Sequence, residues 1–192
     1  AVNCDVWEGF IFINVDPNPE EGLREFLGAM GDQLDGYPFG EMVLAATLRA
    51  DVGTNWKVFT DAFQESYHAG FVHKNSAAAA AASSDDPYAH LTSFRFFGPH
   101  RSTTVPRAPV YDPQPAEGLA FKFATQGLWM AGDAEMPVGT NPNQDPEWLF
   151  DINVLFPNFF VDVANGWYLT YNFWPVAVDR TIYEFRFYMK AP

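Results

Sequence analysis

The sequence predicts an α+β domain in which a curved antiparallel sheet packs around a long helix. Four strand-like runs separated by turn signals follow one another in the C-terminal third: 148–156, 159–164, 167–174 and 180–189. The dipeptide Asn165-Gly166 is the strongest hairpin signal among those turns. In the last run, apolar and mostly polar side chains alternate, as is typical of a sheet with one buried face. With a helix-like stretch over 55–73, these runs predict a helix-grip (START-like) domain with a deep apolar pocket.

The N-terminal half is expected to add further strands to this sheet. Residues 6–16 form an apolar run rich in Phe and Ile, and 41–52 alternate in polarity, so both predict strands. Between them, apolar spacing over 23–27 predicts a short helix. Two more strands are expected at 91–97 and 101–105.

Two segments have no firm assignment from their residues. Ala77–Ala82 lies within the low-complexity stretch 74–87, and alanine favours helix. The run is either a mobile lid over a site or a surface helix and loop without a special role. Residues 106–147 carry many prolines and glycines around one apolar stretch, and their secondary structure stays open.

A carboxylate and two histidines lie within 55–73 at a spacing typical of metal sites. Glu65, His68 and His73 follow the pattern carboxylate-x2-His-x4-His. Two neutral imidazoles and one carboxylate leave half of an octahedral iron(II) open for dioxygen and substrate. The alternative is a solvated helical face that carries two unrelated histidines.

Helical geometry constrains this site. On an ideal helix Asp61, Glu65 and His68 share one face. The opposite face is aromatic and consists of Trp56, Phe59, Phe63 and Tyr67. His73 lies about 140° round the helix from His68, so both rings can reach one ion only if the helix breaks between them. Gly70 is the expected position of that break, and Thr54 is the expected N-cap of the helix.

Three segments resemble one enzyme family. Asn55-Trp56-Lys57, Asp61, Glu65-Ser66-Tyr67-His68 and His73 resemble the iron-binding segment of Rieske-type non-haem iron ring-hydroxylating oxygenases, in the catalytic domain of the α subunit. The run Val6–Pro17 resembles the strand that follows the Rieske domain in that family. Leu155-Phe156-Pro157-Asn158 resembles a later turn. The resemblance covers 1–192 as a partial catalytic domain.

The resemblance implies roles for particular residues. His68 and His73 match the two histidine ligands of the mononuclear Fe(II). Glu65 matches an acidic residue that is not a ligand but connects the iron to the Rieske cluster of a neighbouring subunit. Asp61 stands where many members carry asparagine, so it either accepts a hydrogen bond from a ligating histidine or belongs to the helix surface.

The resemblance also implies two components that this chain does not supply. A Rieske cluster needs two cysteines and two histidines, and the chain has the single cysteine Cys4. The family's third iron ligand is an aspartate on a helix after the sheet, so we expect it beyond Pro192 and expect the Rieske domain before Ala1. Four carboxylates within the chain remain weaker candidates for that ligand: Asp151, Asp162, Asp179 and Glu184.

Composition limits the partners. The 192 residues include 48% hydrophobic residues and carry a net charge of −13. That acidity argues against nucleic acids and anionic membranes as partners. A single cysteine gives no internal disulfide and fits a reducing cytoplasm. The sequence contains no run long enough to span a membrane and no basic-then-apolar signal pattern at its start.

Three functions fit these patterns to different degrees. The first is an oxygenase that hydroxylates an apolar, aromatic or polycyclic substrate with O2, supplied with electrons by a reductase, with or without a ferredoxin. As the resemblance implies, it would assemble as a homotrimer or an α/β hetero-oligomer. The second is a di-iron enzyme, but no second Glu-x-x-His element occurs. The third is a metal-free helix-grip module that binds an apolar ligand, and it leaves the Glu65, His68 and His73 spacing unexplained.

Overall fold

Two antiparallel sheets and a few short helices make up the described part of the chain. The computed structural model describes residues 2–73, 90–106 and 136–190, with the isolated positions 86, 88, 115, 116 and 119. The main sheet consists of β3 (Met42–Val52), β4 (Ser93–Phe97), β5 (His100–Pro106), β6 (Trp148–Leu155), β7 (Phe159–Val163), β8 (Trp167–Ala177) and β9 (Arg180–Lys190). Its strand order is β3-β9-β8-β7-β6-β5-β4, and every pairing is antiparallel.

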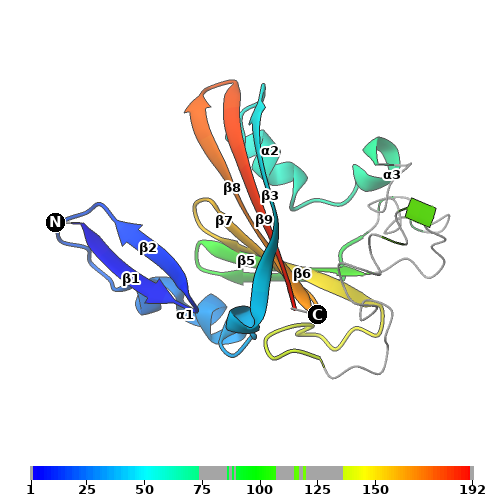
Figure 1. The fold of residues 1–192 in the computed structure, drawn as a ribbon, viewed down its shortest axis with the longest axis horizontal. Helices are drawn as coiled ribbons and strands as arrows, with labels where there is room; N and C mark the ends of the chain where they lie inside the picture. Colours follow the sequence, from blue (N-terminus) through cyan, green and yellow to red (C-terminus); the bar gives the residue numbers. More distant parts are fainter. Residues whose placement is uncertain are drawn as a thin grey trace.

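The α+β class and the C-terminal meander are therefore confirmed (Figure 1). Strands β4 to β9 are paired in chain order, and short turns join each pair except β5 and β6, which are separated by residues 107–147. Strand β3 is the exception, since it pairs with β9 at the far edge of the sheet. The first strand of the main sheet in chain order therefore lies next to the last one. In the described ranges, none of the helices is long and apolar enough to cross a membrane.

The first predicted strand is instead a hairpin. Strand β1 (Asn3–Trp7) pairs with β2 (Phe10–Asn14) in a separate two-stranded sheet. The chain reverses at Glu8 and Gly9, whose φ angles are 49° and 85°. Two successive positive φ values are what a two-residue hairpin turn requires, and glycine adopts them at little cost. The apolar residues on both sides hid this turn in the sequence.

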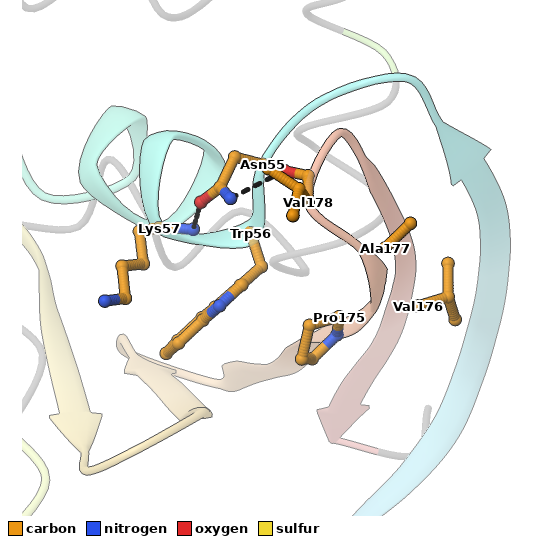
Figure 2. A pocket seen from close by; sticks show the side chains of 7 residues that line it. All are labelled: Asn55, Trp56, Lys57, Pro175, Val176, Ala177 and Val178. Carbon is orange, nitrogen blue, oxygen red and sulfur yellow. Dashed lines mark hydrogen bonds between the residues drawn. The ribbon is translucent and has the colours of Figure 1, made fainter.

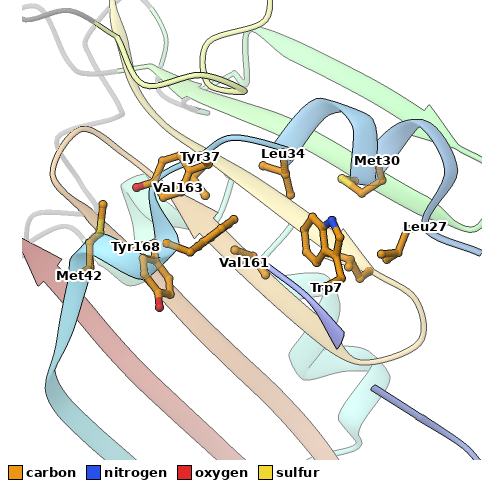
Figure 3. Close-up of a cluster of buried hydrophobic side chains, with 11 residues drawn as sticks. Trp7, Leu27, Met30, Leu34, Tyr37, Met42, Val161, Val163 and Tyr168 are labelled. Atoms are coloured by element: carbon orange, nitrogen blue, oxygen red, sulfur yellow. The ribbon is translucent and has the colours of Figure 1, made fainter. Parts of the chain in front are cut away.

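Helix α1 (Leu23–Leu34) covers one face of the main sheet and is longer than the predicted helix over 23–27. Its backbone is interrupted at Gly28, where φ is 49°. Figure 3 shows Leu27, Met30 and Leu34 directed toward Trp7 and the sheet. These residues belong to the α1 core, whose members are Trp7, Leu27, Met30, Leu34, Tyr37, Phe39, Met42, Leu155, Val161, Val163 and Tyr168.

Helix α2 (Trp56–Ala62) lies over β8 on the opposite face of the sheet. Alternate side chains of β7 point to opposite faces of the sheet. Val161 and Val163 belong to the α1 core, and Phe160 belongs to the α2 core. Buried residues of the α2 core are Val154, Phe160, Tyr171 and Phe173, and Trp56, Phe59, Phe63, Ile152, Leu169, Tyr183 and Phe185 pack against them. We call this side of the sheet the α2 face.

The helix predicted over 55–73 is two short helices. Helix α2 ends at Ala62, and α3 spans only Ala69–Val72. The expected break at Gly70 was therefore wrong, because the chain leaves the helix at Phe63. The rings of Phe63 and Tyr171 lie 4.9 Å apart, and this aromatic packing holds Phe63 on the sheet. The Ala77–Ala82 run and most of 106–147 lie outside the described residues.

The two histidines left out of the predicted site have other partners. His100 is buried, its Nε2 donates to the carbonyl of Phe26 at 2.7 Å, and its Nδ1 accepts the Phe156 N–H at 3.0 Å. His90 is exposed, and its Nδ1 lies 2.6 Å from a carboxylate oxygen of Asp86. His100 therefore has a structural role between α1 and the sheet.

The α1 core should dominate the stability of this domain. Leu34 is fully buried, so we expect Leu34→Ala to lower the free energy of unfolding by about 2 to 5 kcal/mol, through lost burial and the cavity left behind. Urea denaturation of the whole protein measures this. Val58→Ala, on the exposed side of α2, is the control and should cost less than about 1 kcal/mol. Equal losses in the two variants would contradict the assignment of the core.

Candidate metal centre

The start of α2 is fixed to the sheet by Asn55. Its side-chain oxygen accepts the N–H of Lys57 at 3.0 Å, so Asn55 is the N-cap in place of the expected Thr54. Its amide nitrogen donates to the carbonyl of Val178, in the turn between β8 and β9, at 2.6 Å (Figure 2). One residue therefore both begins the helix and ties it to the sheet.

The end of α2 is fixed by aromatic packing. Phe63 is the C-cap residue, and its ring lies 5.2 Å from Phe173 as well as 4.9 Å from Tyr171. Backbone N–H groups of Gln64 and Glu65 then bond to the carbonyl of Asp61, which closes a turn. The chain after Phe63 is thereby directed off the helix axis, and the predicted ligands lie in this turn and in α3.

The structure brings His68 and His73 together. Their ring centres are 5.1 Å apart, with 67° between the ring planes. Two imidazoles bound to one ion at about 2 Å per metal–nitrogen bond place their ring centres roughly 4.5 to 6 Å apart. His68 precedes α3 and His73 follows it, so one short helical turn separates the two rings. Their separation is therefore compatible with a shared metal ion.

Glu65 lies beside His68. One carboxylate oxygen is 2.6 Å from His68 Nδ1, and the other accepts the backbone N–H of His68 at 3.2 Å. The Nδ1 contact lacks hydrogen-bond alignment, and this buried nitrogen has no hydrogen-bond partner among the described residues. Both side chains keep about a quarter of their surface exposed, at 23% and 24%. Because Glu65 lies at the Nδ1 side of the His68 ring, a cation would be bound through Nε2, and imidazole donors suit iron.

Asp61 and Tyr67, which were predicted to lie on opposite faces of one helix, are not grouped with the two histidines. Asp61 is exposed in the last turn of α2, and its backbone carbonyl, not its carboxylate, contributes to the turn that follows. Tyr67 is 61% exposed and does not join the aromatic side that packs on the sheet. Both residues were assigned to faces of a continuous helix, which the break at Phe63 removes.

The weaker carboxylate candidates lie elsewhere. Asp151 accepts the Thr104 hydroxyl at 2.6 Å, Asp162 pairs with Tyr171, and Glu184 pairs with Arg49. Asp179 lies in the exposed β8–β9 turn. Within 2–73, 90–106 and 136–190, no group of three His, Cys, Asp or Glu side chains is arranged to hold a metal ion. The described part of the chain thus presents two neighbouring histidines, with Glu65 beside one of them, but no set of three side chains arranged around one point.

A surface cavity lies at the other end of α2. It has a volume of about 450 Å³ and is lined by Trp56, Lys57 and residues 175–178 of the β8–β9 hairpin (Figure 2). The histidines do not line it. The cavity and the pair of histidines are therefore separate features of the described chain.

Sequence reasoning missed a buried carboxyl group on the α2 face. Both carboxyl oxygens of Asp162 lie 3.0 Å from the Tyr171 hydroxyl, which donates to them. Burial raises the pKa of the Asp162 carboxyl well above its usual range, although the Tyr171 hydrogen bond acts in the opposite direction. Asp162 alternates with Val161 and Val163 along β7, a pattern that predicts a solvent-facing side chain, so no local signal in the sequence indicated its burial.

Comparison with known proteins decides the family. The family model described as "Ring hydroxylating alpha subunit (catalytic domain)" matches residues 39–191. This chain belongs to that family. The match covers the main sheet, both short helices near the histidines, and the histidines themselves.

Relatives of known structure and sequence agree with this family. The carnitine monooxygenase oxygenase subunit of Escherichia coli K12 is 33% identical over 73 residues, which cover 38% of this chain and 20% of that protein. The structure of the quaternary ammonium Rieske monooxygenase CntA with an inhibitor matches 99% of this chain with a TM-score of 0.66 and 17% identity. Naphthalene 1,2-dioxygenase from Rhodococcus sp. also matches 99%, with the same score and identity. The chain spans 42% and 46% of those two structures.

The raised pKa of Asp162 predicts how stability depends on pH. The folded protein binds this proton more tightly than the unfolded chain, whose carboxyl titrates near pH 4. Stability should therefore fall as pH rises above about 4, until pH passes the folded-state pKa. The Asp162→Asn variant has no carboxyl group to titrate at this position. The free energy of unfolding of the variant, minus that of the wild type, should therefore increase between about pH 5 and pH 8.

Urea denaturation at several pH values measures this difference. Asp179→Asn, in the exposed β8–β9 turn, is the control for the loss of one carboxylate. Parallel stability curves for the wild type and Asp162→Asn would contradict a protonated Asp162.

Proposed function

We propose that this chain is the iron-binding part of a Rieske oxygenase that hydroxylates an apolar substrate with O2. His68 and His73 would hold a mononuclear Fe(II), with a carboxylate from outside the described residues as the third ligand. When bound, the iron supplies the dioxygen-activating chemistry of this class. The observation that carries the proposal is the 5.1 Å separation of the two imidazole rings on either side of α3.

Glu65 is proposed as the carboxylate through which the iron site connects with its electron donor. It contacts both the ring and the backbone of His68 while remaining partly exposed. A residue in this position can orient the imidazole and still reach a partner surface. The Rieske cluster itself does not fit this chain, which has one cysteine, so the proposal assigns it to another domain or subunit.

The α2 face supplies a wall for the substrate. Three aromatic side chains are half-buried there: Trp167, Phe185 and Phe187. The ring centres of Trp167 and Phe187 lie 6.0 Å apart. Such rings exclude water and favour an apolar or aromatic body. The relatives differ in substrate, since one is a carnitine monooxygenase and another a naphthalene dioxygenase. We propose an aromatic substrate because aromatic side chains dominate this wall.

The electron partners follow from the class. The structure of a quaternary ammonium Rieske monooxygenase that is similar to this chain gave insights into inter-subunit electron transfer in that enzyme. We propose a comparable arrangement here, in which a reductase, with or without a ferredoxin, delivers electrons to a homotrimer or an α/β hetero-oligomer.

Iron binding tests the two histidines. His68→Ala and His73→Ala should each weaken Fe(II) binding by more than about tenfold, because each removes one ligand. Anaerobic reconstitution of the whole protein followed by metal analysis measures this. His90→Ala is the matched control, since His90 is exposed and pairs with Asp86. Wild-type iron content in both ligand variants would refute the proposed site.

Turnover tests Glu65 separately. Glu65→Gln should leave iron content near that of the wild type, while product formation falls by about tenfold or more, because the charged connection to the donor is lost. Paired iron analysis and product assays decide this. Glu41→Gln, an exposed residue before β3, controls for the loss of one charge. Loss of iron from Glu65→Gln would make Glu65 a ligand.

A further inference from the structure

An arginine lies on the α2 face of the sheet. Arg101 of β5 pairs directly with Val154 of β6, which belongs to the α2 core. Residues directly opposite each other on antiparallel strands point to the same face. Register is regular here, since the bulge in this pair of strands occurs only at Val105 and Pro106. Arg101 therefore faces the side of the sheet that carries the aromatic wall.

Arg101 differs from the other arginines that the structure describes. Its Nε is buried and has no hydrogen-bond partner, and it forms no ion pair within the described ranges. Every other described arginine contacts a carboxylate or an amide: Arg24 with Asp32 and Asp35, Arg49 and Arg186 with Glu184, Arg95 with Gln33, and Arg180 with Asp51. In a chain with 24 acidic residues and 11 basic ones, such a partner is easily supplied. A buried guanidinium nitrogen without one is costly.

Thr103 provides a second unsatisfied polar group beside it. Thr103 is two residues further along β5 and pairs with Ile152, so it points to the same face. The residue is 4% exposed, and its hydroxyl has no hydrogen-bond partner among the described residues. Phe94 and Phe96 of β4 are directly opposite Thr103 and Arg101, and both rings remain exposed. Arg101 and Thr103 thus lie two positions apart on one face of β5, opposite two phenylalanines of β4.

We propose that Arg101 and Thr103 bind a carboxylate group of the substrate. A guanidinium offers paired N–H donors that match two carboxylate oxygens, and the threonine hydroxyl adds a third donor. The exposed rings of Phe94 and Phe96 on the neighbouring strand would contact the apolar body of the same molecule. This inference rests on the proposed function and specifies its substrate class, an apolar or aromatic carboxylate.

The pair lies on the same face of the sheet as the residues that hold the start of the metal-binding segment. A row of directly paired residues crosses the α2 face from Arg101 through Val154 and Phe160 to Tyr171. Three inter-strand steps span roughly 15 Å. Phe63, whose ring lies 4.9 Å from Tyr171, is two residues before Glu65. The same face therefore carries the carboxylate-binding pair at one end and the start of the metal-binding segment at the other.

The test compares benzoate with benzamide, an uncharged probe of nearly the same shape. Binding to the iron-loaded, anaerobic whole protein is measured by calorimetric titration, with iron content determined on the same samples. The wild type should prefer benzoate. Arg101→Gln should weaken benzoate binding by roughly 10- to 100-fold and change benzamide binding by less than about twofold. Arg49→Gln is the matched control, because Arg49 is exposed on β3 and pairs with Glu184.

Two further variants keep the test decisive if Arg101→Gln fails to fold. Arg101→Lys should retain part of the benzoate preference, and Thr103→Val should lower benzoate affinity by about three- to tenfold. Equal affinities for the two probes in the wild type, or an unchanged preference in the Arg101 variants, would overturn the inference. Because these are binding measurements, they remain distinct from the iron and turnover tests: loss of iron in the wild-type sample would count against the proposed function alone.

Discussion

The packing of Phe63 between Tyr171 and Phe173 is the constraint on which the site depends. An uninterrupted helix would place His68 and His73 about 140° apart, so no rotamer change could bring both rings to one ion. Phe63 instead ends α2 on the sheet, at ring separations of 4.9 and 5.2 Å. The chain then turns and re-forms a helix only for Ala69–Val72, which places the rings 5.1 Å apart. The closeness of the two histidines is thus a consequence of aromatic packing.

The opposite ends of α2 have complementary roles. Asn55 caps the helix and bonds to the β8–β9 turn, while Phe63 docks the other end on β8. Between them the helix is short enough to be rigidly held by the sheet at both ends. The segment that carries Glu65, His68 and His73 begins directly after this doubly attached helix, so the start of that segment is held in place.

The two faces of the main sheet differ in whether their buried polar groups have hydrogen-bond partners. On the α1 side, Gln33 connects Arg95 with Ser102 and Asn153, so buried polar groups there are satisfied by one another. On the α2 face, Asp162 is satisfied by Tyr171, whereas Arg101 and Thr103 are not satisfied within the described residues. Buried polar groups cost free energy unless they are bonded. The unsatisfied ones therefore occur on the face that we assign to substrate.

Local sequence patterns were enough to predict the fold class, most of the strands and the three residues of the proposed metal site. Alternation and turn residues depend on neighbours in the chain, so β4 to β9 could be predicted closely, and the spacing of Glu65, His68 and His73 was itself the metal signature. Only the folded structure established the pairing of β3 with β9, the break at Phe63 and the surroundings of Asp162 and Arg101. Each of these depends on side chains far apart in sequence that meet only when the sheet forms, and no local pattern encodes such contacts.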